Sequence, residues 1–510
     1  MGKFYVTTPI YYVNDVPHIG HAYTTLAADV LARYWKLRGE RVYFLTGTDE
    51  HGQKIQRAAE SQGISPQELV DKNAQSFKTL WKKMNINYDD FIRTTEARHQ
   101  KAVQAFTQKL MQNNAIYLGE YEDWYCVPDE TYWTQTQLDA NGNCPSCHRP
   151  VERLKESSYF FKMSNCQSHL LKHMDQHPDC ILPEVRWNET RSFVEGGLRD
   201  LSVSRTTFNW GIPVPGAQGH VIYVWVDALV NYISALGWPD DPEGKFKTFW
   251  PADVHLIGKD ILRHHAVYWP CLLMAAGVEL PKTIFAHGWW TVDGQKMSKS
   301  LGNFVDPNLV IDQFGLDAFR YFLLREVAFG QDGDFSIAAL KQRINSDLAN
   351  DLGNLLSRIC GMVSRYLEGK ISGVLKVEGI DRDLEQGLFK TEREVEIHTK
   401  TLSFYKALIA VWDFINQVNK YIDTSAPWAL FKDPAKRDRL ETVLTYSAAS
   451  LRGTALLLYP YMPASSDKIW AQLGIDEPMS ARPLSQNMSF SLFKPKSPIN
   501  KSEPLFPRVE

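Results

Sequence analysis

Two short stretches of this 510-residue chain combine cations and glycine in a way that suits a polyphosphate. The first is His18-Ile19-Gly20-His21. The second is Lys296-Met297-Ser298-Lys299-Ser300, which lies between Gly294 and Gly302. Imidazole and ammonium groups both donate to phosphate oxygens, and a glycine lets a nucleotide lie against the backbone. Each stretch alone has an ordinary explanation as surface histidines or a solvated lysine turn. Their presence in one chain predicts a polyphosphate site.

The elements around the first stretch indicate how it is positioned. Residues 4–8 are rich in β-branched and aromatic side chains and are predicted as a strand, whereas residues 24–35 have apolar residues at helical spacing. The two histidines therefore lie where a strand is followed by a helix. Backbone N–H groups and the positive end of the helix dipole gather at such a point and favour phosphate.

Alternating strand and helix patterns continue along the chain. We predict further strands over residues 41–46, 221–226, 253–258 and 283–288. This alternation is typical of an open parallel sheet, which binds ligands at the carboxyl ends of its strands. Asp49 follows one of these strands, where its carboxylate could pair with an ammonium group or cap the next helix.

Aromatic and histidine side chains also follow the predicted strands. They lie just beyond a strand end or one turn into the next helix: Tyr12, Trp225, Tyr232, His265 and Trp269. Burial in the core is the usual fate of such residues. Their shared position instead favours one pocket above the sheet edge.

Residues 116–225 interrupt the alternation and contain two pairs of potential metal ligands. Cys126 and Asp129 form one pair and Cys144 and Cys147 the other, each with two residues between. The spacing is typical of a zinc knuckle in which Asp129 replaces a thiolate, or His148 supplies the fourth ligand. A packed knuckle that has lost its metal is the alternative.

The last third of the chain is patterned as helices from about residue 339 to 472, which predicts a helix bundle. A bundle could be purely structural or mediate dimerisation. However, Trp428 follows Pro427 in a turn that suits an exposed aromatic ring, on which an unstacked base can lie. Asn354 and Arg358 are one helical turn apart and so share a face.

Composition sets only wide limits. The chain is 44% hydrophobic and 23% charged, as in ordinary globular proteins, and its net charge of −3 gives no sign of nucleic-acid binding. Any contact with nucleic acid must therefore come from local patches. We expect no signal peptide, no membrane span and, from seven scattered cysteines, a cytoplasmic location.

The histidine and lysine–serine motifs resemble the two signature motifs of class I aminoacyl-tRNA synthetases. The surrounding residues, from Tyr5 to Trp428, are similar to those of methionyl-tRNA synthetases. The resemblance implies an α/β fold, in which a Rossmann-like doubly wound parallel sheet is interrupted by a connective insertion and followed by an all-α anticodon-binding helix bundle. The implied segments are the Rossmann halves at 1–115 and 225–325, the insertion at 116–224, linking helices at 326–345, the bundle at 346–480 and a C-terminal strap at 481–510.

The resemblance also implies roles for individual residues. Methionine binding falls on Ile10, Tyr12, Asp49, Trp225, Ala228, Leu229, Tyr232, His265 and Trp269, with Leu229 in place of a proline found in some members. ATP binding falls on His18, Gly20, His21, Lys296, Ser298 and Lys299, with Mg²⁺ sharing the phosphate charge. Catalysis falls on His18, His21, Lys296 and Lys299. Anticodon recognition falls on Asn354, Arg358, Pro427 and Trp428.

The implied activity is ligation of methionine to its tRNA through methionyl-adenylate. Family members with and without a metal in the insertion exist, so zinc on Cys126, Asp129, Cys144 and Cys147 stays open. We expect a monomer, because the dimerising C-terminal domain of some members has no counterpart here. The rivals are another nucleotidyl-transferring enzyme, a tRNA-binding paralogue without catalysis, and a synthetase for another apolar amino acid.

Overall fold

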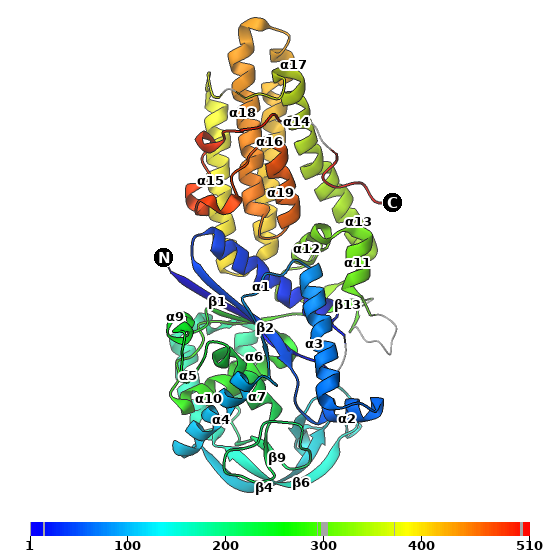
Figure 1. Cartoon of the computed structure of the whole chain (residues 1–510), viewed down its shortest axis with the longest axis vertical. Coiled ribbons are helices and arrows are strands. Elements are labelled where there is room, and N and C mark those ends of the chain that lie inside the picture. Colours follow the sequence, from blue (N-terminus) through cyan, green and yellow to red (C-terminus); the bar gives the residue numbers. More distant parts are fainter. Residues whose placement is uncertain (1, 14–15, 293, 297–303, 372, 500–502) are drawn as a thin grey trace. The chain divides into compact units, whose positions relative to one another are not determined.

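The structure is a computed structural model that describes residues 2–13, 16–292, 294–296, 304–371, 373–499 and 503–510. It divides into two compact units. The sheet unit comprises Lys3–Ala28 and Val42–His287, and the bundle unit comprises Met1–Gly2, Asp29–Arg41 and Gly288–Glu510. Helix α1 (Ile19–Leu37) contributes residues to both units, since the boundary follows Ala28 (Figure 1).

The sheet unit contains a six-stranded sheet in the order β3-β2-β1-β11-β12-β7. Its strands are β1 (Lys3–Tyr12), β2 (Arg41–Asp49), β3 (Asp90–Arg93), β7 (Ile181–Leu182), β11 (Val254–Gly258) and β12 (Ile284–His287). The registers run parallel, for example Val6 opposite Val254 and Leu256 opposite Phe285. The strand order reverses between β1 and β11, which is where such sheets bind ligands. The predicted doubly wound parallel fold is confirmed.

Helices connect the parallel strands and cover the sheet. They are α2 (Gln53–Gln62), α3 (Pro66–Lys83), α4 (Ala97–Gln112), α5 (Gln167–Gln176), α6 (Glu184–Glu195), α7 (Val224–Leu229), α8 (Asn231–Ser234), α9 (Lys245–Phe249), a π-helix (His264–Tyr268) and α10 (Trp269–Ala276). Local sequence sets their ends: Ser65 and Glu68 form a capping box before α3, with Pro66 at its first position. Residues 4–9 of β1 are all buried, the pattern of a strand covered on both faces.

The insertion forms a smaller antiparallel sheet in the order β5-β4-β6-β8. Its strands are β4 (Ile116–Cys126), β5 (Thr131–Trp133), β6 (Glu152–Phe161) and β8 (Leu201–Ser202), and β9 (Ser204–Arg205) and β10 (Val221–Ile222) form a separate pair. Strand β7 lies in sequence between β6 and β8 but pairs with β12 of the main sheet.

The predicted strand over residues 221–226 is wrong beyond Ile222. β10 ends there and pairs antiparallel with β9, and helix α7 begins at Val224. Val224, Val226 and Ala228 are buried within this helix. A short, continuous apolar run fits a buried helix as well as a buried strand, so periodicity alone could not separate the two.

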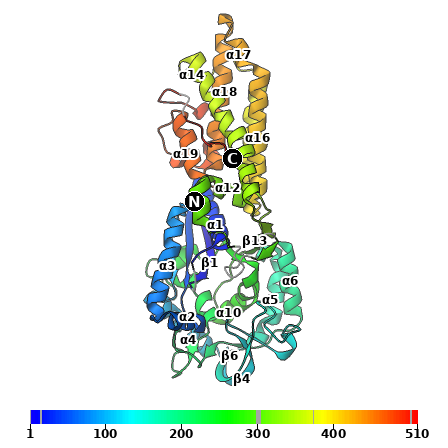
Figure 2. The same ribbon diagram turned by 90° about the vertical axis from the view of Figure 1, so that its right-hand side faces the viewer.

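The bundle unit is mainly helical, as predicted. Its helices are α11 (Pro307–Phe314), α12 (Leu316–Arg325), α13 (Ile337–Arg343), a π-helix (Ile344–Gly353), α14 (Asn354–Leu367), α15 (Gly379–Lys400), α16 (Phe404–Ser425), α17 (Pro427–Leu430), α18 (Arg437–Leu458) and α19 (Pro463–Gln472). Figures 1 and 2 show α14, α16 and α18 side by side along the bundle. Helix α18 is buried continuously from Thr442 to Leu458. A small sheet, β14-β13-β15 (Gln295–Lys296, Trp290–Val292 and Gly333–Asp334), lies in the same unit.

The C-terminal segment is irregular and held by the bundle. Phe493 and Leu505 are buried, and the buried Arg452 of α18 donates to the backbone carbonyl of Asn487 at 2.6 Å.

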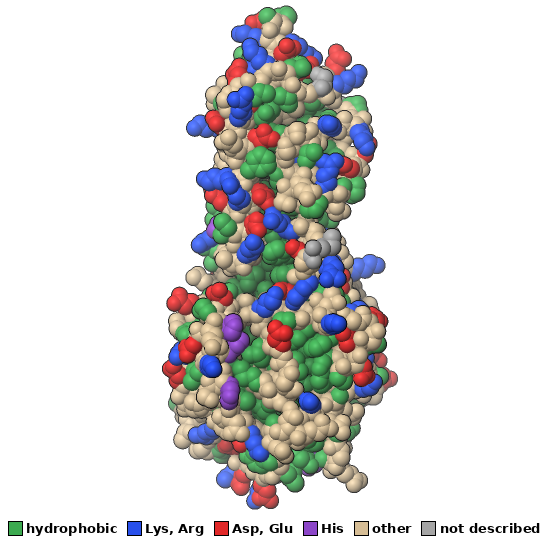
Figure 3. All heavy atoms as spheres, turned by 90° about the vertical axis from the view of Figure 1, so that its left-hand side faces the viewer, with side chains coloured by type: hydrophobic (Ala, Val, Ile, Leu, Met, Phe, Trp, Pro, Cys, Tyr) green, Lys and Arg blue, Asp and Glu red, His purple; other side chains and the backbone are tan. Residues whose placement is uncertain are grey.

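Basic and acidic side chains are interspersed on the face seen in Figure 3. Among the helices that the structure describes, none is long and apolar enough to cross a bilayer.

Candidate active site and anticodon surface

His18 and His21 lie at the start of α1, close together. Their ring centroids are 3.8 Å apart. The Nδ1 atom of His18 accepts from the Gly20 N–H at 3.0 Å, and Nδ1 of His21 accepts from the His18 N–H at 3.1 Å. A neutral imidazole whose Nδ1 accepts carries its proton on Nε2. Both rings therefore have a donor at Nε2.

Burial keeps His21 neutral, and the His18 ring leaves no room for a side chain at Gly20. Burial and the neighbouring His18 ring lower the pKa of His21 well below its ordinary value. A Cβ atom at Gly20 would lie 2.8 Å from Cε1 of His18, so a larger residue would displace that ring.

The lysine–serine loop is described only at its start. Lys296 ends β14, where its backbone pairs with Thr291 of β13. Ser298 and Lys299 lie outside the described residues. Their expected roles toward ATP stay predictions.

Asp49 ends β2 and is 5% exposed. Its Oδ1 has no hydrogen-bond partner among the described residues. Burial, and then the charges of Asp227, Glu130 and Glu50, raise the pKa of Asp49 well above its ordinary value. The N-cap of α2 is Gly52, so the capping role considered for Asp49 is wrong. A buried carboxyl group with an unused oxygen is suited to binding a cation.

The predicted aromatic and histidine residues meet next to this edge of the sheet. The Tyr232 hydroxyl donates to Nε2 of His265 at 2.7 Å, because Nδ1 of His265 donates to the Ile261 carbonyl at 2.9 Å. Burial lowers the pKa of His265 to about 4, which keeps it neutral. Trp269 lies 6.0 Å from Tyr232 between ring centroids, and Trp225 lies 6.3 Å from His265.

The other expected pocket residues lie on β1 and α7. Ile10 and Tyr12 are on β1 and half-buried, whereas Ala228 and Leu229 are buried in α7. The Tyr12 hydroxyl lies 2.8 Å from the His51 carbonyl and 3.0 Å from Oε1 of Glu130. Tyr12 is thereby held at the end of β1 near Asp49.

Sequence reasoning missed the residues that support these side chains. Buried Asp227 accepts from Nδ1 of His51 at 2.7 Å and from Nε2 of His99 at 2.8 Å. The half-buried His264 ring stacks on Trp225, with centroids 3.7 Å apart. A lone acidic residue within the apolar run of α7 was the available signal for Asp227, because a buried carboxylate needs partners.

The four expected metal ligands form one cluster. One ligand atom from each of Cys126, Asp129, Cys144 and Cys147 lies within 4.8 Å of the others. The Sγ atoms of Cys126 and Cys147 are 3.5 Å apart, and Sγ of Cys144 lies 3.1 Å from Oδ2 of Asp129. His148 is exposed, and its Nδ1 is 3.1 Å from Asp139. Asp129 rather than His148 therefore completes the cluster.

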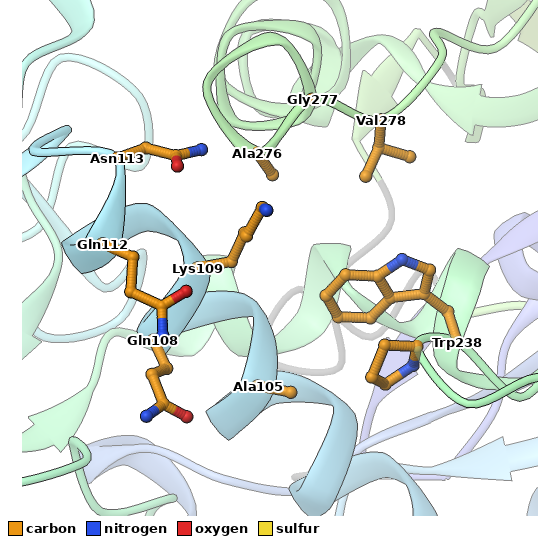
Figure 4. A pocket seen from close by; sticks show the side chains of 10 residues that line it. Ala105, Gln108, Lys109, Gln112, Asn113, Trp238, Ala276, Gly277 and Val278 are labelled. Carbon is orange, nitrogen blue, oxygen red and sulfur yellow. The ribbon is translucent and has the colours of Figure 1, made fainter.

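Two cavities of about 490 Å³ lie elsewhere in the sheet unit. One lies between α4, Trp238 and the C-terminal end of α10, and polar side chains of α4 project toward it (Figure 4). The other is lined by the insertion and by Arg263 and Tyr268 of the π-helix region. None of the expected site residues lines either cavity.

The expected anticodon residues lie at two neighbouring helices of the bundle unit. The Arg358 guanidinium on α14 is 5.6 Å from the ring centroid of Trp428, which is 41% exposed. Asn354 is exposed at the start of α14, and Pro427 is the buried first residue of α17. The structure thus brings an exposed aromatic ring and a cation together.

Comparisons with known proteins agree over the whole chain. The family model for class I tRNA synthetases (M) matches residues 4–153 and 149–360, and the anticodon-binding domain of tRNA ligase matches residues 381–501. The methionine–tRNA ligase of Caldanaerobacter subterraneus subsp. tengcongensis is 52% identical over 99% of this chain and 79% of its own length. That of Fusobacterium nucleatum is 50% identical over 100% and 80%.

A solved structure shows the same fold. Mycobacterium tuberculosis methionyl-tRNA synthetase in complex with methionyl-adenylate is 42% identical, with a TM-score of 0.95 over 100% of both chains. Family models, relatives and fold therefore agree, and the chain belongs to the methionine–tRNA ligase family of class I tRNA synthetases.

Proposed function

We propose that this chain carries out the reaction of its family in two steps. A carboxylate oxygen of methionine attacks the α-phosphorus of ATP, which forms methionyl-adenylate and releases pyrophosphate. A hydroxyl of the terminal tRNA ribose then attacks the methionyl carbonyl carbon and releases AMP. The reaction needs no protein nucleophile, so the protein contributes positioning and stabilisation of charge.

Asp49 is the observation that carries the amino-acid site. The methionine ammonium group would bind its Oδ1, which is buried and has no hydrogen-bond partner among the described residues. The negative charges of Asp227, Glu130 and Glu50, which raise the pKa of Asp49, also attract this ammonium group.

The methionine side chain would lie among Trp225, Tyr232, His265 and Trp269. A thioether packs against aromatic rings with a gain of about 0.3–1.5 kcal/mol. His265 is neutral and its Nε2 is occupied by the Tyr232 hydroxyl, so it presents no charge to the thioether. Shorter apolar side chains would lose about 1–3 kcal/mol for each missing methylene. Ile10, Tyr12, Ala228 and Leu229 complete the proposed pocket.

His18, Gly20 and His21 would bind the triphosphate at the start of α1. Both imidazoles offer an Nε2–H donor there, and the helix N-terminus favours negative charge. Lys296, Ser298 and Lys299 would bind the departing pyrophosphate. Mg²⁺, when bound, would share the phosphate charge. Lys299→Ala should therefore slow adenylate formation by about 10²–10³-fold while changing methionine affinity little.

Asn354, Arg358, Pro427 and Trp428 would read the anticodon. An exposed indole with a guanidinium beside it can stack an unpaired base and attract its phosphate. Monomeric state and cytoplasmic location stay predictions.

Zinc fits the cysteine cluster chemically. Three thiolates and one carboxylate make an acceptable tetrahedral set, and their ligand atoms are already within 4.8 Å of one another. Zinc would supply a cross-link between the two knuckle loops. Zinc measured in the purified protein should reach about one ion per chain and disappear in Cys144→Ser. A wild-type protein without zinc after expression in zinc-supplemented medium would favour the metal-free knuckle.

ATP–pyrophosphate exchange, measured with each amino acid in the absence of tRNA, tests the activity. Exchange with methionine alone is expected. Exchange with another amino acid would keep the mechanism and reject the proposed pocket. No exchange with zinc-loaded protein would favour a tRNA-binding paralogue.

A further inference from the structure

Glu130 connects the cysteine cluster to the proposed methionine pocket. It follows Asp129 of the cluster directly and is 2% exposed. Its φ angle is +51°, in the left-handed region that non-glycine residues rarely adopt. Such backbone at a buried acidic residue requires support from its surroundings, and it often marks a functional position.

The Glu130 carboxylate is held by donors from three elements. Oε1 accepts from the Lys54 N–H in the first turn of α2 at 3.0 Å. It also lies 3.0 Å from the Tyr12 hydroxyl of β1, whose single proton it shares with the His51 carbonyl at 2.8 Å. Oε2 accepts from the Tyr125 hydroxyl of β4 at 3.2 Å. The carboxylate therefore fixes a proposed pocket residue relative to a helix start that lacks an acidic side chain of its own.

The space around this contact leaves little freedom. A Cβ atom at Gly52 would lie 2.5 Å from the Tyr12 hydroxyl oxygen and 2.7 Å from Oε1 of Glu130. Gly52 itself has a φ angle of +106°. A residue larger than glycine at position 52 would therefore displace the Tyr12 hydroxyl or the Glu130 carboxylate.

The backbone of Glu130 is fixed from the cluster side. Oδ2 of Asp129 lies 3.1 Å from Sγ of Cys144, which ties this turn to the second knuckle loop. The Tyr223 hydroxyl donates to the Glu130 carbonyl at 2.8 Å, just before α7 begins. The turn that carries Glu130 is thus connected both to the second knuckle loop and to the residue before α7.

We propose that Glu130 is a positioning residue for the amino-acid pocket: it orients Tyr12, and the cysteine–aspartate cluster orients Glu130. The knuckle then has a role in methionine binding beyond its own folding. This inference rests on the proposed function, because it assumes that methionine binds beside Tyr12 and Asp49.

Calorimetric titration of the full chain with methionine, without ATP or tRNA, tests the proposal. Glu130→Ala should weaken methionine binding by about tenfold, since it leaves buried donors unpaired. Glu130→Gln keeps one carbonyl oxygen for Tyr12 and Lys54 and should stay within about threefold of wild type. Both variants keep a non-glycine residue at this left-handed backbone position. The difference between their methionine affinities therefore reports the hydrogen bonds of the side chain at position 130. Glu122→Ala, in the exposed part of β4, is the matched control.

Double variants test whether Glu130 acts through Tyr12 and the cysteine–aspartate cluster through Glu130. In a Tyr12→Phe background Glu130→Ala should cost less than about threefold, because the coupled hydroxyl is already gone. Cys144→Ser, or removal of zinc by a chelator, should weaken methionine binding in wild type and add little in Glu130→Ala. An undiminished effect of Glu130→Ala in the Tyr12→Phe background would overturn the proposal. So would a lower melting temperature with unchanged methionine affinity in Glu130→Ala and in wild type treated with a chelator. If wild type itself does not bind methionine, the proposed function fails instead.

Discussion

The proposed methionine pocket and the proposed anticodon surface use similar residue types in opposite environments. In the sheet unit, Tyr232, His265 and Trp269 are almost completely buried, and the hydroxyl of Tyr232 pairs with His265. In the bundle unit, Trp428 is 41% exposed beside the half-buried Arg358. Aromatic rings are therefore buried around the proposed ligand site in one unit and exposed for stacking in the other.

This difference predicts how each region responds to substitution. When a buried residue that pairs with a charged ligand group is replaced, the ligand's charge stays desolvated and unpaired, which costs much binding free energy. When an exposed aromatic residue is replaced, one stacking contact with the ligand is lost and water fills the space. Single substitutions should thus have large effects in the pocket and moderate ones at the surface.

Replacement of Asp49 should have the largest effect. Asp49→Asn keeps the size of the side chain but removes the charge opposite the methionine ammonium group. Loss of one partner of a buried charge pair costs about 2–5 kcal/mol, or roughly 30- to several-thousand-fold in kcat/KM. ATP–pyrophosphate exchange measures it, with exposed Glu60→Gln on α2 as the control. A loss below about tenfold would place the ammonium group elsewhere.

His18→Ala should separate catalysis from binding within the same unit. It removes an Nε2–H donor proposed to act on the triphosphate, so adenylate formation should slow by about 10²–10³-fold. Methionine affinity should change little, because His18 lies at the start of α1 outside the aromatic cluster. Single-turnover kinetics and calorimetry report the two quantities separately. Equal losses in both would contradict the assignment.

The strand-end residues could be predicted from sequence because parallel sheets collect them at one edge. Asp49 ends β2, the two histidines follow β1, and His265 follows β11, so local patterns located each of them. The same local reasoning failed at α7, where a helix and a strand share one apolar pattern. Short-range periodicity thus located the strand-end residues, but it could not tell helix from strand at every segment.

The supporting contacts could not be predicted, because they join distant parts of the chain. Glu130 meets Tyr12 across 118 residues, and Asp227 meets His51 across 176. No local spacing encodes such a pair. Only the folded arrangement of the insertion and α7 around β1 and β2 brings these residues together.

Trp428→Ala should have a moderate effect on charging and none on activation. One stacked base is worth about 1–3 kcal/mol, so aminoacylation of tRNA should fall by about 5–150-fold while ATP–pyrophosphate exchange stays unchanged. Phe431→Ala is a matched control, since Phe431 is 44% exposed near Trp428 but stacks on Tyr366. An unchanged charging rate in Trp428→Ala would remove this residue from the anticodon surface.

The smallest expected effect is a pH dependence confined to the pocket. The pKa of Asp49 is raised in the free protein, mainly by burial, whereas a bound ammonium group favours the ionised carboxylate. Methionine binding should therefore release protons, and affinity should fall as the pH drops below this raised pKa, by at most about tenfold per pH unit. Burial also raises the pKa of Glu130, which acts in the same direction, while the lowered pKa values of His21 and His265 keep both rings neutral near pH 7.

Calorimetry in buffers of different ionisation enthalpy would count the released protons, and Asp49→Asn should flatten the profile. The anticodon surface provides the contrast, because neither an indole nor a guanidinium titrates between pH 6 and 8. Binding of tRNA alone should therefore change much less with pH than binding of methionine. A methionine affinity that is independent of pH in wild type would mean that Asp49 is already ionised in the free pocket, and the low-dielectric description of this pocket would then have to be abandoned.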